Sequence, residues 1–72
     1  MKPLTAKQTA RILEANGFVI SRQKGSHIIY KNANGVIVPV PTHGGNKPIP
    51  IGTFLAIVKQ SGVGPESFKS IT

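Results

Sequence analysis

The chain has 72 residues, no cysteine and a formal net charge of +7, so it is small and strongly basic. This length accommodates one hydrophobic core, and we expect a single domain over residues 1–72 without disulfides or thiolate metal sites. We also expect neither a signal peptide nor a membrane span, which favours a cytoplasmic protein.

The first predicted element is a helix that begins at Thr5. Thr5 and Gln8 have the spacing of a capping box, in which each side chain binds the backbone amide of the other residue. The apolar residues that follow recur at helical spacing, which gives the helix one face for the core and one for solvent. Gly17 is expected to end this helix.

Two strands joined by a tight turn are predicted next. Apolar residues in the segment 18–22 alternate in the manner of a strand, with Phe18 and Ile20 on the same side. Residues 24–26, Lys-Gly-Ser, form the turn, and residues 27–31 form the second strand.

The orientation of the second strand stays open at this point. Ile28 and Tyr30 share one face of it, whereas His27, Ile29 and Lys31 share the other. The sequence does not decide which face packs against the helices. Tyr30 is therefore either a core residue or a residue that stacks on a base.

A second hairpin leads to the third strand. The segment Asn32–Gly35 predicts this hairpin, because Asn34 and Gly35 both tolerate a positive φ. Residues 36–40 form the third strand. Pro39 and Pro41 have no amide hydrogen to donate, so we expect this strand at an edge of the sheet.

The last part of the chain predicts a loop, a helix and a short terminal turn. Residues 41–50 are rich in proline and glycine and form the loop, and the helix then runs from Ile51 until Gly62 stops it. Pro65 starts the terminal turn, which brings Phe68 onto the core. Helical spacing places four apolar residues on one face of the helix, which Ile57 widens: Ile51, Phe54, Leu55 and Val58.

The element order is therefore helix, three-stranded antiparallel meander, helix. With so few strands, a single core exists only if both helices cover the same face of the sheet, which leaves the other face to solvent. This α+β arrangement is the α-β-β-β-α layout of the double-stranded-RNA-binding domain. The analogy of fold favours RNA as the partner.

The charge gives independent support for a nucleic-acid partner. Nine lysines and arginines against two acidic residues attract phosphates and release counterions on binding. An acidic protein would also fit, whereas a membrane surface fits less well because the basic residues do not line one face of an amphipathic helix. The residues that we expect to bind RNA are Lys7, Arg11, Lys31 and Lys47.

The two histidines are the candidates for proton transfer, since histidine is the side chain that ordinarily titrates near neutral pH. His27 follows a Gly-Ser turn flanked by Arg22 and Lys24, where cations and backbone amides suit a phosphate. The alternative for His27 is a plain surface position. For His43 the choice stays open between a substrate contact, a second acid or base, and an ordinary loop position.

A metal-dependent reaction is not expected, and neither is a cofactor. Glu14 and Glu66 lie far apart in the sequence, so they cannot form the paired carboxylates of a two-metal nuclease. Two histidines without cysteine or a neighbouring acid make a poor zinc site. Any hydrolysis would then use the 2′-hydroxyl of RNA as the nucleophile.

Three segments resemble the HicA (YcfA-like) toxin family. They are residues 25–30 with Gly-Ser-His, residues 38–43 with Val-Pro-Val-Pro-Thr-His, and residues 49–62 with Ile-Gly-Thr at the helix entry. The segments occur in the order and at the spacing of the family, and the resemblance extends across nearly the whole chain. One departure is Phe54, which stands where leucine is usual and changes core volume.

The resemblance implies a small ribonuclease that cleaves mRNA, has a double-stranded-RNA-binding-like fold and is neutralised by a HicB antitoxin. It also implies that His27, in the Gly-Ser-His triplet, is the catalytic histidine. We expect the free toxin to be monomeric.

The resulting hypothesis is that His27 takes the proton of a ribose 2′-hydroxyl, which attacks the adjacent phosphorus and leaves a 2′,3′-cyclic phosphate and a 5′-hydroxyl. Lys24, with Arg22 or the turn at Ser26, stabilises the charge on the phosphoryl oxygens. The acid for the leaving group is open between His43, a lysine and water. The alternative functions are a non-catalytic RNA-binding module and a protein that binds an acidic partner.

Overall fold

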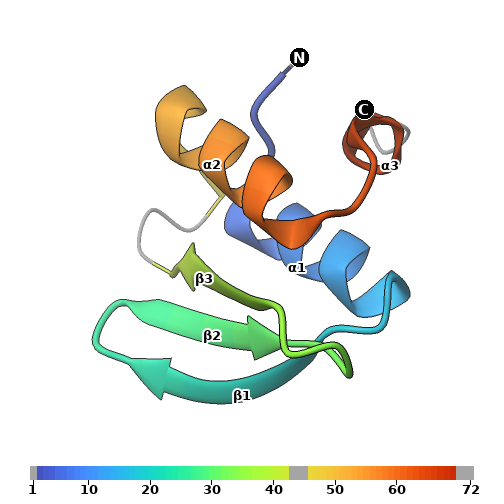
Figure 1. The fold of residues 1–72 in the computed structure, drawn as a ribbon. Helices are drawn as coiled ribbons and strands as arrows, with labels where there is room; N and C mark the ends of the chain where they lie inside the picture. The colour runs from blue at the N-terminus through green and yellow to red at the C-terminus, as the bar shows by residue number, and fades with distance from the viewer. Residues whose placement is uncertain (1, 43–45, 70–72) are drawn as a thin grey trace.

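A three-stranded antiparallel sheet forms one layer of the molecule, and helices form the other (Figure 1). The computed structural model describes residues 2–42 and 46–69. Within these ranges the order of elements is the predicted α-β-β-β-α, followed by one short helix. The elements are α1 (Ala6–Ala15), β1 (Val19–Lys24), β2 (His27–Lys31), β3 (Ile37–Pro41), α2 (Ile51–Ser61) and α3 (Pro65–Lys69).

The register of the sheet settles which face of β2 meets the helices. Ile28 pairs with Val40 and Tyr30 pairs with Val38, and paired residues of antiparallel strands point to the same side. Tyr30, Val38 and Val40 are buried in the core, with Ile28 packed against it. Tyr30 is therefore a core residue.

The other three residues of β2, which alternate with Ile28 and Tyr30, point to the opposite side of the sheet, which we call the open face. His27 pairs with Pro41, Ile29 with Pro39, and Lys31 with Ile37. The strand order is β1-β2-β3, so the prolines of β3 lie in an edge strand as predicted.

The start of α1 is the predicted capping box. The Thr5 hydroxyl accepts a hydrogen bond from the Gln8 amide at 3.1 Å, and the Gln8 side chain accepts one from the Thr5 amide, also at 3.1 Å. The helix ends at Ala15, and Gly17 then takes a φ of 88°. The prediction for both ends of this helix is confirmed.

The prediction for the first strand was wrong in its limits. β1 begins after Phe18 and continues to Lys24, because its pairing with β2 extends to the turn, where Lys24 lies opposite His27. Phe18 is a buried core residue that precedes the strand, whereas every residue of β1 is exposed. An irregularity between Ile20 and Arg22 also breaks the predicted alternation.

The hairpin between β2 and β3 also differs from its prediction. Among the described residues only glycines have a positive φ, so Gly35 (φ 82°) takes this conformation and Asn34 does not. Instead, the Asn32 side-chain oxygen accepts hydrogen bonds from the Asn34 amide at 3.0 Å and the Val36 amide at 2.9 Å. This side-chain turn uses Val36, and β3 therefore begins one residue later than predicted.

Both α1 and α2 cover the same face of the sheet, as predicted (Figure 1). The face that α2 presents to the core is narrower than expected: Ile51 and Leu55 are 48% and 46% exposed, and their predicted core positions were wrong. The helix contacts the edge strand β3. Its buried residues are Phe54, Ile57, Val58 and Ser61.

The end of the chain closes the core as predicted. Gly62, with a φ of 71°, ends α2, and Pro65 begins α3. Phe68 of α3 is buried and meets Phe54 edge to face, with ring centres 5.8 Å apart.

The segment just before α2 packs against the start of the chain. Pro48 forms an isolated bridge with Thr5, and the Ile49 amide donates a hydrogen bond to the Leu4 carbonyl at 2.8 Å. Leu4 and Ile49 are both buried. The described part of the predicted loop is therefore fixed beside the first turn of α1. No helix within the described residues is long and apolar enough to cross a membrane.

Candidate functional site

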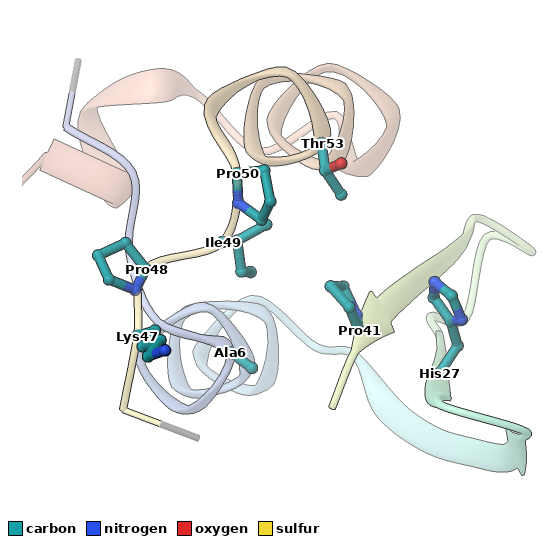
Figure 2. A pocket seen from close by; sticks show the side chains of 8 residues that line it. All are labelled: Ala6, His27, Pro41, Lys47, Pro48, Ile49, Pro50 and Thr53. Carbon is teal, nitrogen blue, oxygen red and sulfur yellow. The ribbon is translucent and has the colours of Figure 1, made fainter. Parts of the chain in front are cut away.

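His27 lies at a corner of the sheet where three segments meet. It is the first residue of β2, it follows the turn at Gly25 and Ser26, and it lies beside Pro41 at the end of β3 (Figure 2). Its side chain is half-buried. Gly25 has a φ of 59°, a conformation that favours glycine and allows β2 to start directly after a two-residue turn.

Thr42 fixes the turn that precedes His27. The Ser26 carbonyl accepts two hydrogen bonds from Thr42, one from its amide at 2.7 Å and one from its hydroxyl at 2.9 Å. This link joins the turn to the end of β3, so the backbone on both sides of the imidazole is held in place. The sequence analysis did not single out Thr42, since its partner is revealed only by the register of β2 and β3.

The open face of the sheet brings two predicted cations to His27. Lys24 lies directly opposite His27 in the pairing of β1 with β2, and Arg22 lies opposite Ile29, the next residue on the same face. Lys24 and His27 line a pocket on this face together with Ile29 and Pro39. We call it the basic pocket, because Lys24 supplies a cation in the same pocket as the imidazole.

A second pocket lies on the other side of His27, between the sheet and the two long helices. It has a volume of about 320 Å³ and is lined by Ala6, His27, Pro41, Thr53 and the segment 47–50 (Figure 2). Three of its lining residues are prolines, so we call it the proline pocket. Lys47, predicted to bind RNA, contributes to its wall. His27 therefore lies between the basic pocket and the proline pocket.

The remaining predicted RNA-binding residues do not gather around His27. Lys31 lies at the far end of β2, although on the open face. Lys7 and Arg11 lie exposed on α1, in the other layer, and Lys7 lines a different pocket beside Tyr30. His43 lies outside the described residues, and so does any part that it plays in the site.

The buried tyrosine has a perturbed pKa. Burial of Tyr30 disfavours the charged phenolate and raises its pKa above the ordinary value, and the negative charge of Glu14 adds to this effect. Tyr30 lies on the core side of the sheet, whereas the basic pocket lies on the open face. The raised pKa therefore affects the stability of the fold.

Potential metal ligands are scattered over the part of the chain that the structure describes. No three histidine, aspartate or glutamate side chains within it lie close enough to hold a metal ion.

Comparison with protein families gives a match over most of the chain. The profile of a family described as "HicA toxin of bacterial toxin-antitoxin" matches residues 6–63. The matched region extends from α1 to just after α2, and it contains His27, Lys24, Thr42 and both pockets that meet at the imidazole. No curated protein matches the chain.

Proposed function

Because the chain belongs to the HicA toxin family of bacterial toxin–antitoxin systems, we propose that it is a metal-independent endoribonuclease of the cytoplasm that cleaves mRNA. Membership of the family makes it a toxin of such a system. The observation that carries the catalytic proposal is the position of His27, between a basic pocket and the proline pocket. An RNA strand that crosses this corner would bring its ribose and phosphate to the imidazole together.

The reaction that this geometry supports is transesterification at phosphorus. His27 takes the proton of a 2′-hydroxyl, the 2′-oxygen forms a bond to the adjacent phosphorus, and the bond from phosphorus to the 5′-oxygen breaks. The products are a 2′,3′-cyclic phosphate and a 5′-hydroxyl. Within the described residues no protein group hydrogen-bonds the His27 side chain.

Two cations on the open face lie close to where negative charge would develop on the phosphoryl group. Lys24 shares the basic pocket with His27, and Arg22 lies one residue pair away on the same face. Both are placed to stabilise negative charge on the phosphoryl oxygens. The departing 5′-oxygen takes its proton from a lysine that shares a pocket with His27, from His43 or from water. The lysines that share a pocket with His27 are Lys24 and Lys47.

The test compares the wild type with His27→Ala on single-stranded RNA in the presence of EDTA. We expect the substitution to reduce cleavage by about 10²- to 10⁴-fold, the contribution of one general acid–base group. Wild-type product should carry a 2′,3′-cyclic phosphate, and a single 2′-deoxynucleotide at the cleavage site should stop the reaction. Thermal unfolding of both proteins checks that they are folded. Equal cleavage by the two proteins would contradict the role of His27.

Neutralisation by a HicB-type antitoxin is a further part of the proposal. Expression of the wild type should arrest growth, expression of His27→Ala should not, and co-expression of a HicB-type protein should restore growth. The purified antitoxin should also stop cleavage of RNA at equimolar amounts. Growth arrest that no HicB-type protein relieves would count against this partner.

Binding of RNA without cleavage is the second candidate, and the net charge of +7 favours it. It predicts an affinity that falls steeply with salt, with a slope of about −0.7 per phosphate contacted on a single strand. Under this alternative the wild type gives no product at any concentration, and His27→Ala binds RNA like the wild type.

A further inference from the structure

The proline pocket lies on the other side of His27 from the basic pocket, in which the proposed mechanism places the phosphate. We propose that it holds the base of the nucleotide whose 2′-hydroxyl attacks. This inference rests on the proposed ribonuclease activity, and it adds a contact with the substrate that governs which RNA sites are cleaved.

The size and walls of the pocket suit a single base. Its volume of about 320 Å³ lies at the lower end of the range of about 300–1,000 Å³ for small-molecule sites. Pro41, Pro48 and Pro50 supply rigid rings, and Ala6 and Ile49 supply further apolar surface (Figure 2). A flat heterocycle packs well against such surfaces, whereas a charged phosphate would lose its hydration there without full compensation.

The position of His27 selects which base enters. In the proposed reaction the imidazole contacts the 2′-hydroxyl, and the base is attached to the neighbouring carbon of the same ribose. Since His27 lines both pockets, a ribose at the imidazole directs its base into one of them and its 3′-phosphate toward the other. The open face carries two cations, Lys24 in the basic pocket and Arg22 one residue pair away, whereas Lys47 is the one lysine among the apolar walls of the proline pocket. This difference assigns the phosphate to the open face and the base to the proline pocket.

Polar groups at the wall give the base hydrogen-bonding partners. Thr53 and Lys47 line the pocket, and neither side chain makes a hydrogen bond or an ion pair within the described residues. Thr53 points toward the interior of the pocket from the first turn of α2 (Figure 2). A hydroxyl both donates and accepts, so Thr53 can pair with the edge of a base.

The other apolar pocket fits this role less well. It is lined by Ala6, Ala10, Tyr30 and their neighbours, and His27 does not contribute to it. A base bound there would therefore not share a nucleotide with the reacting hydroxyl.

The experiment removes the base and blocks the pocket in turn. The cleavage site of a single-stranded RNA oligonucleotide is mapped first, and two oligonucleotides are then made with an abasic ribonucleotide, one at the 5′ side of the scissile phosphate and one further upstream. The protein variants are Thr53→Phe, which fills the pocket from an exposed position, and Ala56→Phe, a matched control on the exposed side of α2 that lines no pocket described here. Thr53→Ser serves as the conservative variant.

We expect the abasic nucleotide beside the scissile phosphate to lower kcat/KM of the wild type by about tenfold, a factor typical of one stacked base. Thr53→Phe should show a similar loss on the intact RNA and no additional loss on the abasic RNA. Ala56→Phe should behave like the wild type, and Thr53→Ser should keep most of the activity. Equal effects of the two abasic positions, or an undiminished abasic effect in Thr53→Phe, would overturn the proposal.

A binding measurement separates this proposal from the activity on which it rests. Titration with a nucleoside 3′-monophosphate should shift the NMR amide signals of Ala6, Ile49 and Thr53 in the wild type but not in Thr53→Phe. Ribose phosphate without a base should not shift them. Such shifts in a protein that cleaves no RNA would leave a base site and refute the ribonuclease; cleavage without these shifts would leave the ribonuclease and refute the base site.

Discussion

At the scale of single residues, the backbone that carries His27, the proposed general base, is fixed by a residue that is distant in sequence. Thr42 binds the Ser26 carbonyl with both its amide and its hydroxyl, and it thereby sets the course of the backbone that enters β2. An imidazole acts as a general base only if it is held within hydrogen-bonding reach of the proton that it takes. Thr42 is for this reason a positioning residue, which itself touches no reacting atom in the proposed mechanism.

Thr42→Val tests this role because it removes the hydroxyl and retains the amide. Loss of one hydrogen bond of about 1 kcal/mol predicts a decrease in kcat of roughly fivefold, with little change in KM. Thr42→Ser restores the hydroxyl and should recover kcat. Steady-state kinetics on RNA gives both constants; a change confined to KM would assign Thr42 to substrate binding instead.

Tyr30 gives a prediction about pH at the same scale. Its pKa is raised in the folded protein by burial and by Glu14, so the unfolded chain loses its proton first as the pH rises. The contribution of Tyr30 to the free energy of unfolding is fully present below the ordinary tyrosine pKa of about 10 and is lost as the pH rises above that value. Tyr30→Phe should weaken this alkaline loss of stability, as measured by thermal unfolding from pH 8 to 11. Parallel curves for the two proteins would contradict it.

At the scale of the elements, local hydrogen bonds decide where α1 begins. The reciprocal bonds between Thr5 and Gln8 satisfy amides that would otherwise have no partner in the first turn. Thr5→Ala should therefore lower the free energy of unfolding by about 1 kcal/mol. Urea denaturation measures this change, and Thr5→Ser, which retains a hydroxyl, is the control that should stay near the wild type.

The buried side of α2 gives a second prediction at this scale, which concerns the stability of the protein. Phe54 is fully buried, and Phe54→Ala should cost about 3–5 kcal/mol of stability. Leu55 is its neighbour in sequence and is largely exposed, so Leu55→Ala should cost far less. Urea denaturation of the two variants compares them directly. Similar losses would show that Leu55 lies in the core after all.

These elements also show what sequence alone can predict. The capping box at Thr5 and the stop at Gly62 depend on residues a few positions apart, and both were predicted correctly. The exposure of Leu55 depends on how α2 lies across β3, and the link from Thr42 to Ser26 depends on strand register. These features depend on contacts between distant parts of the chain, so no pattern of neighbouring residues in the sequence predicts them. His27 could be proposed as a site residue because a Gly-Ser turn beside cations is a local pattern, whereas the two pockets around it depend on the fold.

At the scale of the whole molecule, the positive charge is divided between the two layers. Arg22, Lys24 and Lys31 lie on the open face of the sheet, whereas Lys7 and Arg11 lie on α1. A strand of RNA that reaches His27 across the open face meets the first group. The sequence grouped Lys31 with Lys7 and Arg11, and the fold separates them.

Salt dependence of RNA binding tests this division. With uncleavable single-stranded RNA, Arg22→Gln should reduce the slope of log affinity against log salt by about 0.7, the value for one phosphate contact. Arg11→Gln removes the same charge from the other layer and should leave the slope close to that of the wild type. Equal changes in the two variants would show that RNA also wraps around α1.

The first turn of α1 packs against the segment before α2, and this contact has a consequence for synthesis of the protein on the ribosome. The proline pocket is lined by residues as far apart in the sequence as Ala6 and Thr53. The bridge between Thr5 and Pro48 joins these two parts of the chain, and it forms only after both parts have been synthesised. A growing chain on the ribosome reaches its first strands early but lacks the pocket until most of the polypeptide has been made. The site that we propose for RNA cleavage is therefore complete only late in synthesis.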